Sequence, residues 1–131
     1  MRHNYSYQPG ARLAVWVNGV WHEGIASNGF VGGEQGVISA SLRAGRVAEE
    51  PLRIFAADQP VRVLEPLSDL HPSQVVANAR RAIGQPWHLT KANCQHRVCE
   101  AFGVPPHSPQ LWIGAGLFLL STAALMGACQ R

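Results

Sequence analysis

Residues 11–27 read ARLAVWVNGVWHEGIAS, and this stretch decides the class of the fold. Apolar and other side chains alternate along residues 11–17, which predicts a β-strand with one buried face. The next two residues are Asn18 and Gly19. An Asn-Gly pair between two alternating runs favours a tight hairpin, because both central residues must adopt positive φ. We therefore expect an antiparallel hairpin with its return strand at residues 20–27.

The strand pattern extends to about residue 65. Further strands are expected at residues 37–42 and 61–65, with a second Asn-Gly turn at residues 28–29. A short helical turn is expected between them, at residues 51–57. The N-terminal half of the chain is therefore expected to form an antiparallel sheet.

Helical patterns begin after residue 66. Pro72 suits the first turn of a helix, and apolar residues recur with helical spacing until Gly84 and Pro86 end the pattern. A second helix is expected at residues 94–102, with Asn93 as its N-cap residue. Together these patterns predict an α+β fold in which an antiparallel sheet packs against helices.

The chain has 131 residues, enough for one domain, and its charges are unevenly placed. Residues 101–130 contain no Asp, Glu, Lys or Arg. We expect a folded domain at residues 1–110 and a hydrophobic segment at residues 111–131. As a helix, residues 111–128 span about 27 Å, close to the roughly 30 Å of a bilayer core. A membrane anchor is the preferred interpretation, and a buried C-terminal core helix is the alternative.

The charge pattern also bears on partners and location. The formal net charge is +3, and the basic residues are scattered along the chain, so we expect no nucleic-acid partner. The N-terminal residues lack the apolar core of a signal peptide. We therefore expect a membrane-associated protein whose folded domain lies in the cytoplasm. The sequence does not indicate an oligomeric state.

The segment Asn93-Cys94-Gln95-His96-Arg97-Val98 carries the clearest chemical signal. A cysteine in the first turn of a helix lies at the positive end of the helix dipole, which stabilises a thiolate. Helical spacing places Cys94 on the stripe that faces the sheet. Cys94 is therefore a candidate nucleophile, and the alternative is a small buried hydrophobic residue. The spacing of Cys94, His96 and Cys99 matches no recognised zinc site, so no metal is expected.

A nucleophilic thiol needs a general base, and His96 lies about 200° around the helix from Cys94. Among the other histidines, His22 lies inside a predicted strand beside Gly24, which permits close approach of another backbone. The alternative for His22 is an ordinary half-exposed sheet residue. The remaining candidates are expected in loops or near the termini: His3, His71, His88 and His107.

Taken together, four segments resemble the lecithin:retinol acyltransferase (LRAT) family, whose members are permuted papain-like cysteine enzymes related to NlpC-type peptidases. Residues 9–15 are similar to the family's Pro-Gly-Asp strand, and residues 22–25 to its His-x-Gly-Ile strand. Residues 36–39 are similar to its Val-Ile-His strand, and residues 93–98 (NCQHRV) to its Asn-Cys-Glu-His-Phe-Val motif. The resemblance covers most of residues 8–110, and the last motif is the specific one.

The resemblance implies roles for three residues. Cys94 is the expected nucleophile, His22 its general base, and Ser39 stands where the family often has a second histidine that orients the first. The implied activity is a cofactor-independent acyl transfer or acyl hydrolysis on lipid esters or amides, through a thioester at Cys94. An NlpC-type peptide or amide hydrolase is one alternative. A catalytically weakened, membrane-associated interaction module is another, because serine cannot stabilise an imidazolium as a charged group does.

Overall fold

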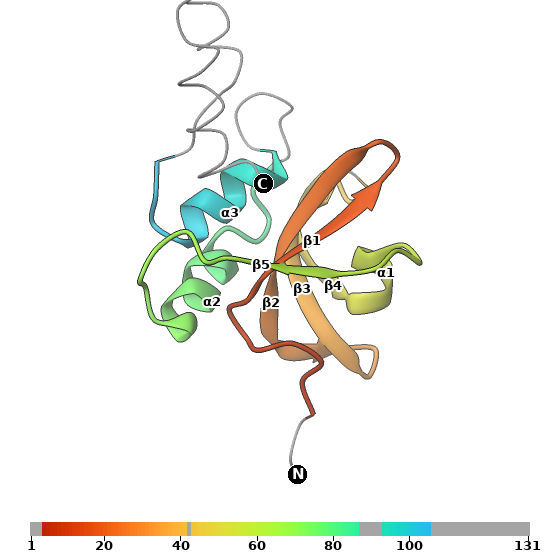
Figure 1. The fold of residues 1–131 in the computed structure, drawn as a ribbon, viewed down its shortest axis with the longest axis horizontal. Helices are drawn as coiled ribbons and strands as arrows, with labels where there is room; N and C mark the ends of the chain where they lie inside the picture. The colour runs from red at the N-terminus through yellow and green to blue at the C-terminus, as the bar shows by residue number, and fades with distance from the viewer. Residues whose placement is uncertain (1–3, 42, 87–92, 106–131) are drawn as a thin grey trace, which may run out of the picture.

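A computed structural model describes residues 4–41, 43–86 and 93–105. In this part of the chain, five strands and three helices form an α+β fold (Figure 1). In chain order they are β1 (Arg12–Val17), β2 (Val20–Val31), β3 (Glu34–Ser41), β4 (Arg46–Pro51), α1 (Leu52–Ala56), β5 (Arg62–Leu64), α2 (Pro72–Arg81) and α3 (Cys94–Ala101). The predicted α+β class and the antiparallel sheet are confirmed.

The five strands form one antiparallel sheet in the order β4-β3-β2-β1-β5. The β1–β2 hairpin turns at Asn18 and Gly19, whose φ angles are 52° and 81°. These are the positive φ values that an Asn-Gly hairpin turn requires. The first hairpin is therefore confirmed, with Val15 opposite His22.

The second expected Asn-Gly turn is wrong. Asn28 and Gly29 lie inside β2, which continues to Val31, and the chain turns instead at Gly32 and Gly33, with φ angles of 60° and 83°. The β2–β3 register shifts between Ala26 and Phe30, on either side of this Asn-Gly pair.

Strand β4 was not predicted from the sequence, whereas the helices were. β4 contains two adjacent glutamates, Glu49 and Glu50, and such charged residues are depleted in strands. The expected short helical turn is α1, and the two later helices are α2 and α3 with nearly the expected bounds. Local sequence signals were sufficient to predict the helices. They were insufficient to predict β4, because tertiary contacts hold that strand in place.

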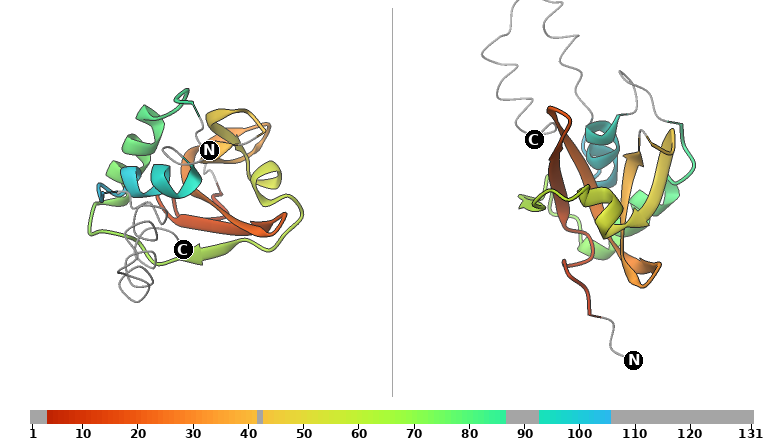
Figure 2. Two further views of the ribbon diagram at one scale, coloured as in Figure 1. Left: turned by 90° about the horizontal axis from the view of Figure 1, so that it is seen from above. Right: turned by 90° about the vertical axis from the view of Figure 1, so that its right-hand side faces the viewer.

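The helices cover the two faces of the sheet unequally. α2 and α3 lie on one side of the sheet and α1 lies on the other (Figures 1 and 2). We call these the helix side and the Phe55 side. A core on the helix side includes Ile25, Ile38 and Cys94, and a separate core on the Phe55 side includes Val15 and Phe55.

Side chains along β2 alternate between these two sides. A Cβ atom on Gly24 would lie 2.8 Å from the Val37 side chain and 3.0 Å from the Phe55 ring, so Gly24 faces the Phe55 side. Such a Cβ atom would also lie 3.1 Å from the carbonyl oxygen of Ile38, so the close backbone approach expected at Gly24 is present. Because neighbours in a strand point to opposite faces, His22 shares the Phe55 side and Glu23 shares the helix side with Ile25.

The expected hydrophobic segment, residues 111–131, lies outside the described residues. Among the helices of the described part, none is long and apolar enough to cross a membrane.

Candidate functional site

Cys94 occupies the position that the sequence predicts. Asn93 is the N-cap residue of α3, and its Oδ1 accepts a hydrogen bond of 3.0 Å from the main-chain N–H of His96. The thiol is therefore in the first turn of a capped helix, where N–H groups favour negative charge. Cys94 is buried and packs with Ile25 and Ile38, so the prediction that it faces the sheet is confirmed.

The sulfur of Cys94 lies against the main chain of β2. Among the described residues, pairing of β2 with β3 begins at Ile25, so the preceding part of β2 is open on that side. The Cys94 Sγ lies 3.9 Å from the carbonyl oxygen of Trp21 and 3.2 Å from Oε1 of Gln95. The Gln95 amide also donates to Trp21 O at 2.8 Å. The side chain of Gln95 therefore bridges the thiol and β2.

The main-chain N–H groups of Glu23, Cys94 and Gln95 favour negative charge on the sulfur. Each of them lowers the pKa of the thiol. Burial acts in the opposite direction and more strongly, and the negative charge of Glu23 adds to it, so the pKa of Cys94 is raised to about 11. At neutral pH the group is therefore a neutral thiol that donates to Oε1 of Gln95.

His22 does not contact the thiol. Its imidazole packs against the Phe55 ring, with 5.0 Å between the ring centroids, on the side of the sheet away from α3. Burial lowers the pKa of His22, and the nearby carboxylate of Glu50 partly offsets this effect. In the described part of the chain, no hydrogen bond joins His22 to Cys94. The structure therefore brings Cys94 to the main chain beside His22 but not to its imidazole.

Ser39 is buried in β3, opposite Ala48 of β4. Its neighbours Ile38 and Ala40 belong to the helix-side core, so alternation places the Ser39 side chain on the Phe55 side with His22. Its Oγ has no hydrogen-bond partner among the described residues. Of the groups on this side, Glu50 rather than Ser39 supplies the charge that favours an imidazolium at His22.

Glu23 is the site residue that sequence reasoning missed. It is 0% exposed, and its Oε1 accepts a hydrogen bond of 2.7 Å from Nε of Arg12, which is 4% exposed. Burial raises the pKa of Glu23 to about 7, against the lowering effect of Arg12. A signal was present in the sequence: Glu23 lies close to the apolar residues Trp21 and Ile25 within a predicted strand, and a buried charge at such a position requires a partner.

The outer surface next to the thiol is aromatic. The indole of Trp21 packs edge-on against Trp16, with 5.2 Å between the centroids, and the guanidinium of Arg62 lies 5.2 Å from the Trp21 ring. Trp16 is 48% exposed. An apolar surface therefore borders the strand segment that contacts the sulfur.

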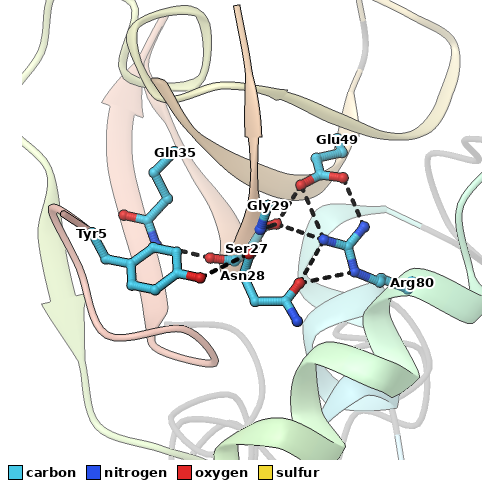
Figure 3. A network of polar contacts seen from close by, with 7 residues as sticks. All are labelled: Tyr5, Ser27, Asn28, Gly29, Gln35, Glu49 and Arg80. Carbon is cyan, nitrogen blue, oxygen red and sulfur yellow. Dashed lines mark hydrogen bonds and ion pairs between the residues drawn. The ribbon is translucent and has the colours of Figure 1, made fainter. Parts of the chain in front are cut away.

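A separate polar cluster joins α2 to the sheet (Figure 3). The guanidinium of Arg80 donates to Oε1 of Glu49 at 2.8 Å and to Oδ1 of Asn28 at 2.6 Å. It also donates to Oγ of Ser27 at 2.9 Å, and that hydroxyl in turn donates to Glu49. The cluster accounts for a glycine at this position of β2: a Cβ on Gly29 would lie only 2.9 Å from Arg80 Nη2.

Comparison with known proteins adds no assignment: neither the protein-family models nor the curated proteins give a match to this chain. Among the described residues, no group of three or more His, Cys, Asp or Glu side chains is arranged to hold a metal ion.

Proposed function

We propose that the chain is a thiol-dependent acyltransferase or acyl hydrolase that acts on lipid esters or amides through a thioester at Cys94. The observation that carries the proposal is the setting of the Cys94 sulfur, in the first turn of a capped helix and beside main-chain N–H groups that favour negative charge on it. Such groups stabilise negative charge on sulfur and on the oxygen of a tetrahedral intermediate.

The proposed reaction has two halves. Cys94 loses its proton to a base, and the thiolate attacks the carbonyl carbon of the substrate to form a C–S bond. The tetrahedral intermediate collapses, the bond to the alcohol or amine breaks, and the leaving group takes up the proton. Water or an acceptor hydroxyl or amine then attacks the thioester. The acyl group leaves with the acceptor, and the thiol is restored by the acceptor's proton.

The resemblance to the LRAT family assigns His22 as the base and Ser39 as its orienting residue, within a permuted papain-like arrangement. Burial lowers the pKa of His22, which keeps its imidazole neutral and able to take a proton near pH 7. In the structure this ring packs on Phe55, so base catalysis by His22 requires it to move to the sulfur. The role of His22 is accordingly the first part of the proposal to test.

Two features favour a lipid substrate and a membrane location for this proposal. Residues 111–128 carry no charged side chain, and as a helix they would span about 27 Å, close to the roughly 30 Å of a bilayer core. Trp16 is exposed and packs against Trp21, whose carbonyl oxygen lies 3.9 Å from the Cys94 sulfur, and tryptophan is common where a protein meets the bilayer interface. A domain tethered beside acyl chains reaches its substrate without soluble delivery.

Acyl transfer to Cys94 can be tested with a soluble activated acyl ester and with phospholipid vesicles. We expect a hydroxylamine-sensitive acyl adduct on the Cys94 peptide by mass spectrometry, and none in Cys94→Ser. Glu100→Gln, at an exposed position of the same helix, is the control variant and should retain the adduct. His22→Gln should slow adduct formation. An adduct at other residues that persists in Cys94→Ser would refute the proposal.

A non-catalytic, membrane-associated interaction module is the second candidate. It is favoured by the pKa of about 11 for Cys94 and by the packing of His22 on Phe55, which together leave an unactivated thiol. This candidate predicts vesicle binding that is equal for the chain and for Cys94→Ser, with no acyl adduct on either substrate. Cleavage of a muropeptide without action on phospholipid would instead identify an NlpC-type hydrolase.

A further inference from the structure

The side-chain amide of Gln95 lies between the candidate nucleophile and β2, and two contacts fix which way round it lies. Its Nε2 donates a hydrogen bond of 2.8 Å to the carbonyl oxygen of Trp21. Its Oε1 lies 3.2 Å from the Cys94 sulfur. A carbonyl oxygen can only accept a hydrogen bond, so the nitrogen of this amide faces Trp21 and its oxygen faces the sulfur.

This orientation makes the sulfur a donor. An amide oxygen also only accepts, so the contact of 3.2 Å requires the proton to be on the sulfur. The Trp21 carbonyl oxygen, 3.9 Å from the sulfur, is a second acceptor. A hydrogen bond that only the protonated form of a group can make favours that form. The side chain of Gln95 therefore opposes the nearby main-chain N–H groups, which favour negative charge on the sulfur.

The contact follows from where α3 begins. Cys94 and Gln95 are the first two residues of α3, and among the described residues the part of β2 before Ile25 has no pairing with β3. Both side chains therefore reach the same main-chain carbonyl of β2. Gln95 is half-buried whereas Cys94 is buried, so solvent and ligands reach the amide more easily than the sulfur.

We propose that Gln95 is an autoinhibitory positioning residue: while its amide is bound to Trp21, it holds Cys94 as a neutral, weakly reactive thiol. The amide cannot turn its nitrogen toward the sulfur without breaking its bond to Trp21. Activation consists of displacing the amide from the sulfur, after which the thiol releases its proton to a base more readily. The significance of this regulation for acyl transfer rests on the proposed function, whereas the hold on the thiol exists with no substrate present.

Charged side chains also surround the site. Among the described residues they come from four elements: Arg12 of β1, Glu23 of β2, Arg62 of β5, and Arg97 and Glu100 of α3. Arg62 lies over the Trp21 ring, with its guanidinium carbon 5.2 Å from the centroid, and the other four form two ion pairs. A substitution at Gln95 removes none of these charges. A comparison of Gln95 variants therefore isolates the effect of the amide.

The experiment compares the full chain with Gln95→Met and Gln95→Glu. The infrared band of the Cys94 S–H group is isolated as the difference between each chain and the same chain carrying Cys94→Ser. An S–H group that donates a hydrogen bond absorbs at a lower frequency than one that does not. Reactivity is the rate of Cys94 alkylation by iodoacetamide at about pH 8, just below the ordinary thiol pKa, followed by mass spectrometry. The thiol pKa is measured from the ultraviolet absorbance of the thiolate.

Gln95→Met has no oxygen to accept the S–H. We expect it to shift the band to higher frequency, to lower the thiol pKa and to be alkylated about fivefold faster, the equivalent of one ordinary hydrogen bond. Gln95→Glu keeps an acceptor of the same length and adds a negative charge, so it should keep the lowered band and react no faster than the wild type. Both variants lose the bond to Trp21, so a merely structural role would speed alkylation in both.

A Cys94 band at the same frequency in the wild type and Gln95→Met would overturn the proposal, as would a Gln95→Met chain that reacts no faster. Faster alkylation with an unchanged thiol pKa would also overturn it, because access to the sulfur would then have changed and not its hold on the proton. If Gln95→Met does not fold, the wild-type band decides: a frequency typical of an S–H without an acceptor overturns the proposal, and a lowered frequency supports it.

The two proposals fail separately. The predicted band shift and faster alkylation of Gln95→Met, without an acyl adduct in the wild type, would refute acyl transfer alone. An acyl adduct on Cys94 without the band shift would refute the role of Gln95 alone.

Discussion

Two arginine–glutamate pairs lie on the helix side of the sheet, and they differ in how completely their polar atoms are used. In the Arg80–Glu49 pair, the guanidinium and the carboxylate share further contacts with Ser27 and Asn28 (Figure 3). Their side chains are 36% and 17% exposed. This pair is saturated with partners and partly hydrated, as expected for a structural tie between α2 and the sheet.

The Arg12–Glu23 pair is more deeply buried and less satisfied. Its side chains are 4% and 0% exposed, and each partner has one buried polar atom without a hydrogen bond among the described residues. Burial raises the pKa of Glu23 to about 7. The difference separates a pair that holds the fold from a pair able to respond to pH.

The largest effect is expected for Arg12→Met. At pH 8 the variant leaves the Glu23 carboxylate buried without a counter-charge, and breaking such a pair costs about 3–5 kcal/mol of unfolding free energy. Urea denaturation measures the loss. The double variant Arg12→Met/Glu23→Leu removes both charges and should be more stable than Arg12→Met. If Arg12→Met/Glu23→Leu were as unstable as Arg12→Met, the loss of stability would come from altered packing and not from the unpaired charge.

The next effect concerns the pH dependence of stability. The pKa of Glu23 is raised in the folded state from 4.5 to about 7. The contribution of Glu23 to the free energy of unfolding is therefore fully present below pH 4.5 and is lost as pH rises through 7. The shift corresponds to about 3 kcal/mol. Glu23→Gln should remove this decline. The contribution of His22 to stability depends on pH in the opposite direction, because its pKa is lowered in the folded state. That contribution is present in both the wild type and Glu23→Gln, so it cancels in the difference between their unfolding free energies.

Denaturation of both chains at several pH values tests this prediction. The wild-type unfolding free energy should fall relative to that of Glu23→Gln between about pH 5 and about pH 8. Parallel curves would mean that Glu23 titrates normally in the folded state, and the contrast between the two pairs would then lose its electrostatic basis.

The parts of the fold that were predicted from sequence depend on local chemistry. The turn at Asn18-Gly19 follows from backbone preference, and the start of α3 from the N-cap at Asn93. Asn28-Gly29 carries the same local signal but lies inside β2, where Arg80 hydrogen-bonds Ser27 and Asn28 and leaves little room for a side chain at Gly29. That requirement arises from contacts more than fifty residues apart, which no local pattern contains.

The candidate site shows the same division. The inward orientation of Cys94 was predicted from helical spacing, since one helix has one buried stripe. Which of two adjacent strand residues, His22 or Glu23, faces that helix depends on which side of the sheet α3 covers. A strand reverses its facing with every residue, so a pattern in sequence alone cannot assign it. The position of Ser39 on the Phe55 side was undetermined for the same reason.

A smaller loss is expected for Arg80→Met, which removes the cation from the saturated cluster. The variant loses hydrogen bonds to Glu49, Ser27 and Asn28, but both Arg80 and Glu49 are partly hydrated, so water replaces some of them. We expect a loss of about 2 kcal/mol by denaturant unfolding. Arg81→Met, at the next and exposed position of α2, is the matched control. A loss in Arg80→Met equal to that of the control would show that the cluster does not stabilise the fold.

The smallest effect is expected for a third pair, Arg53–Glu34, which joins α1 to β3 at the surface. Its Nε–Oε2 distance of 2.7 Å equals that of the Arg12–Glu23 pair, but its side chains are 72% and 34% exposed. Glu34→Gln should therefore cost at most about 1 kcal/mol, and the difference should vanish in high salt because exposed pairs are screened. If the two pairs have equal hydrogen-bond lengths but their disruption costs unequal amounts of unfolding free energy, then burial, rather than contact geometry, determines how much each pair stabilises the fold. A loss as large as that of Arg12→Met would contradict this explanation of the contrast between the pairs.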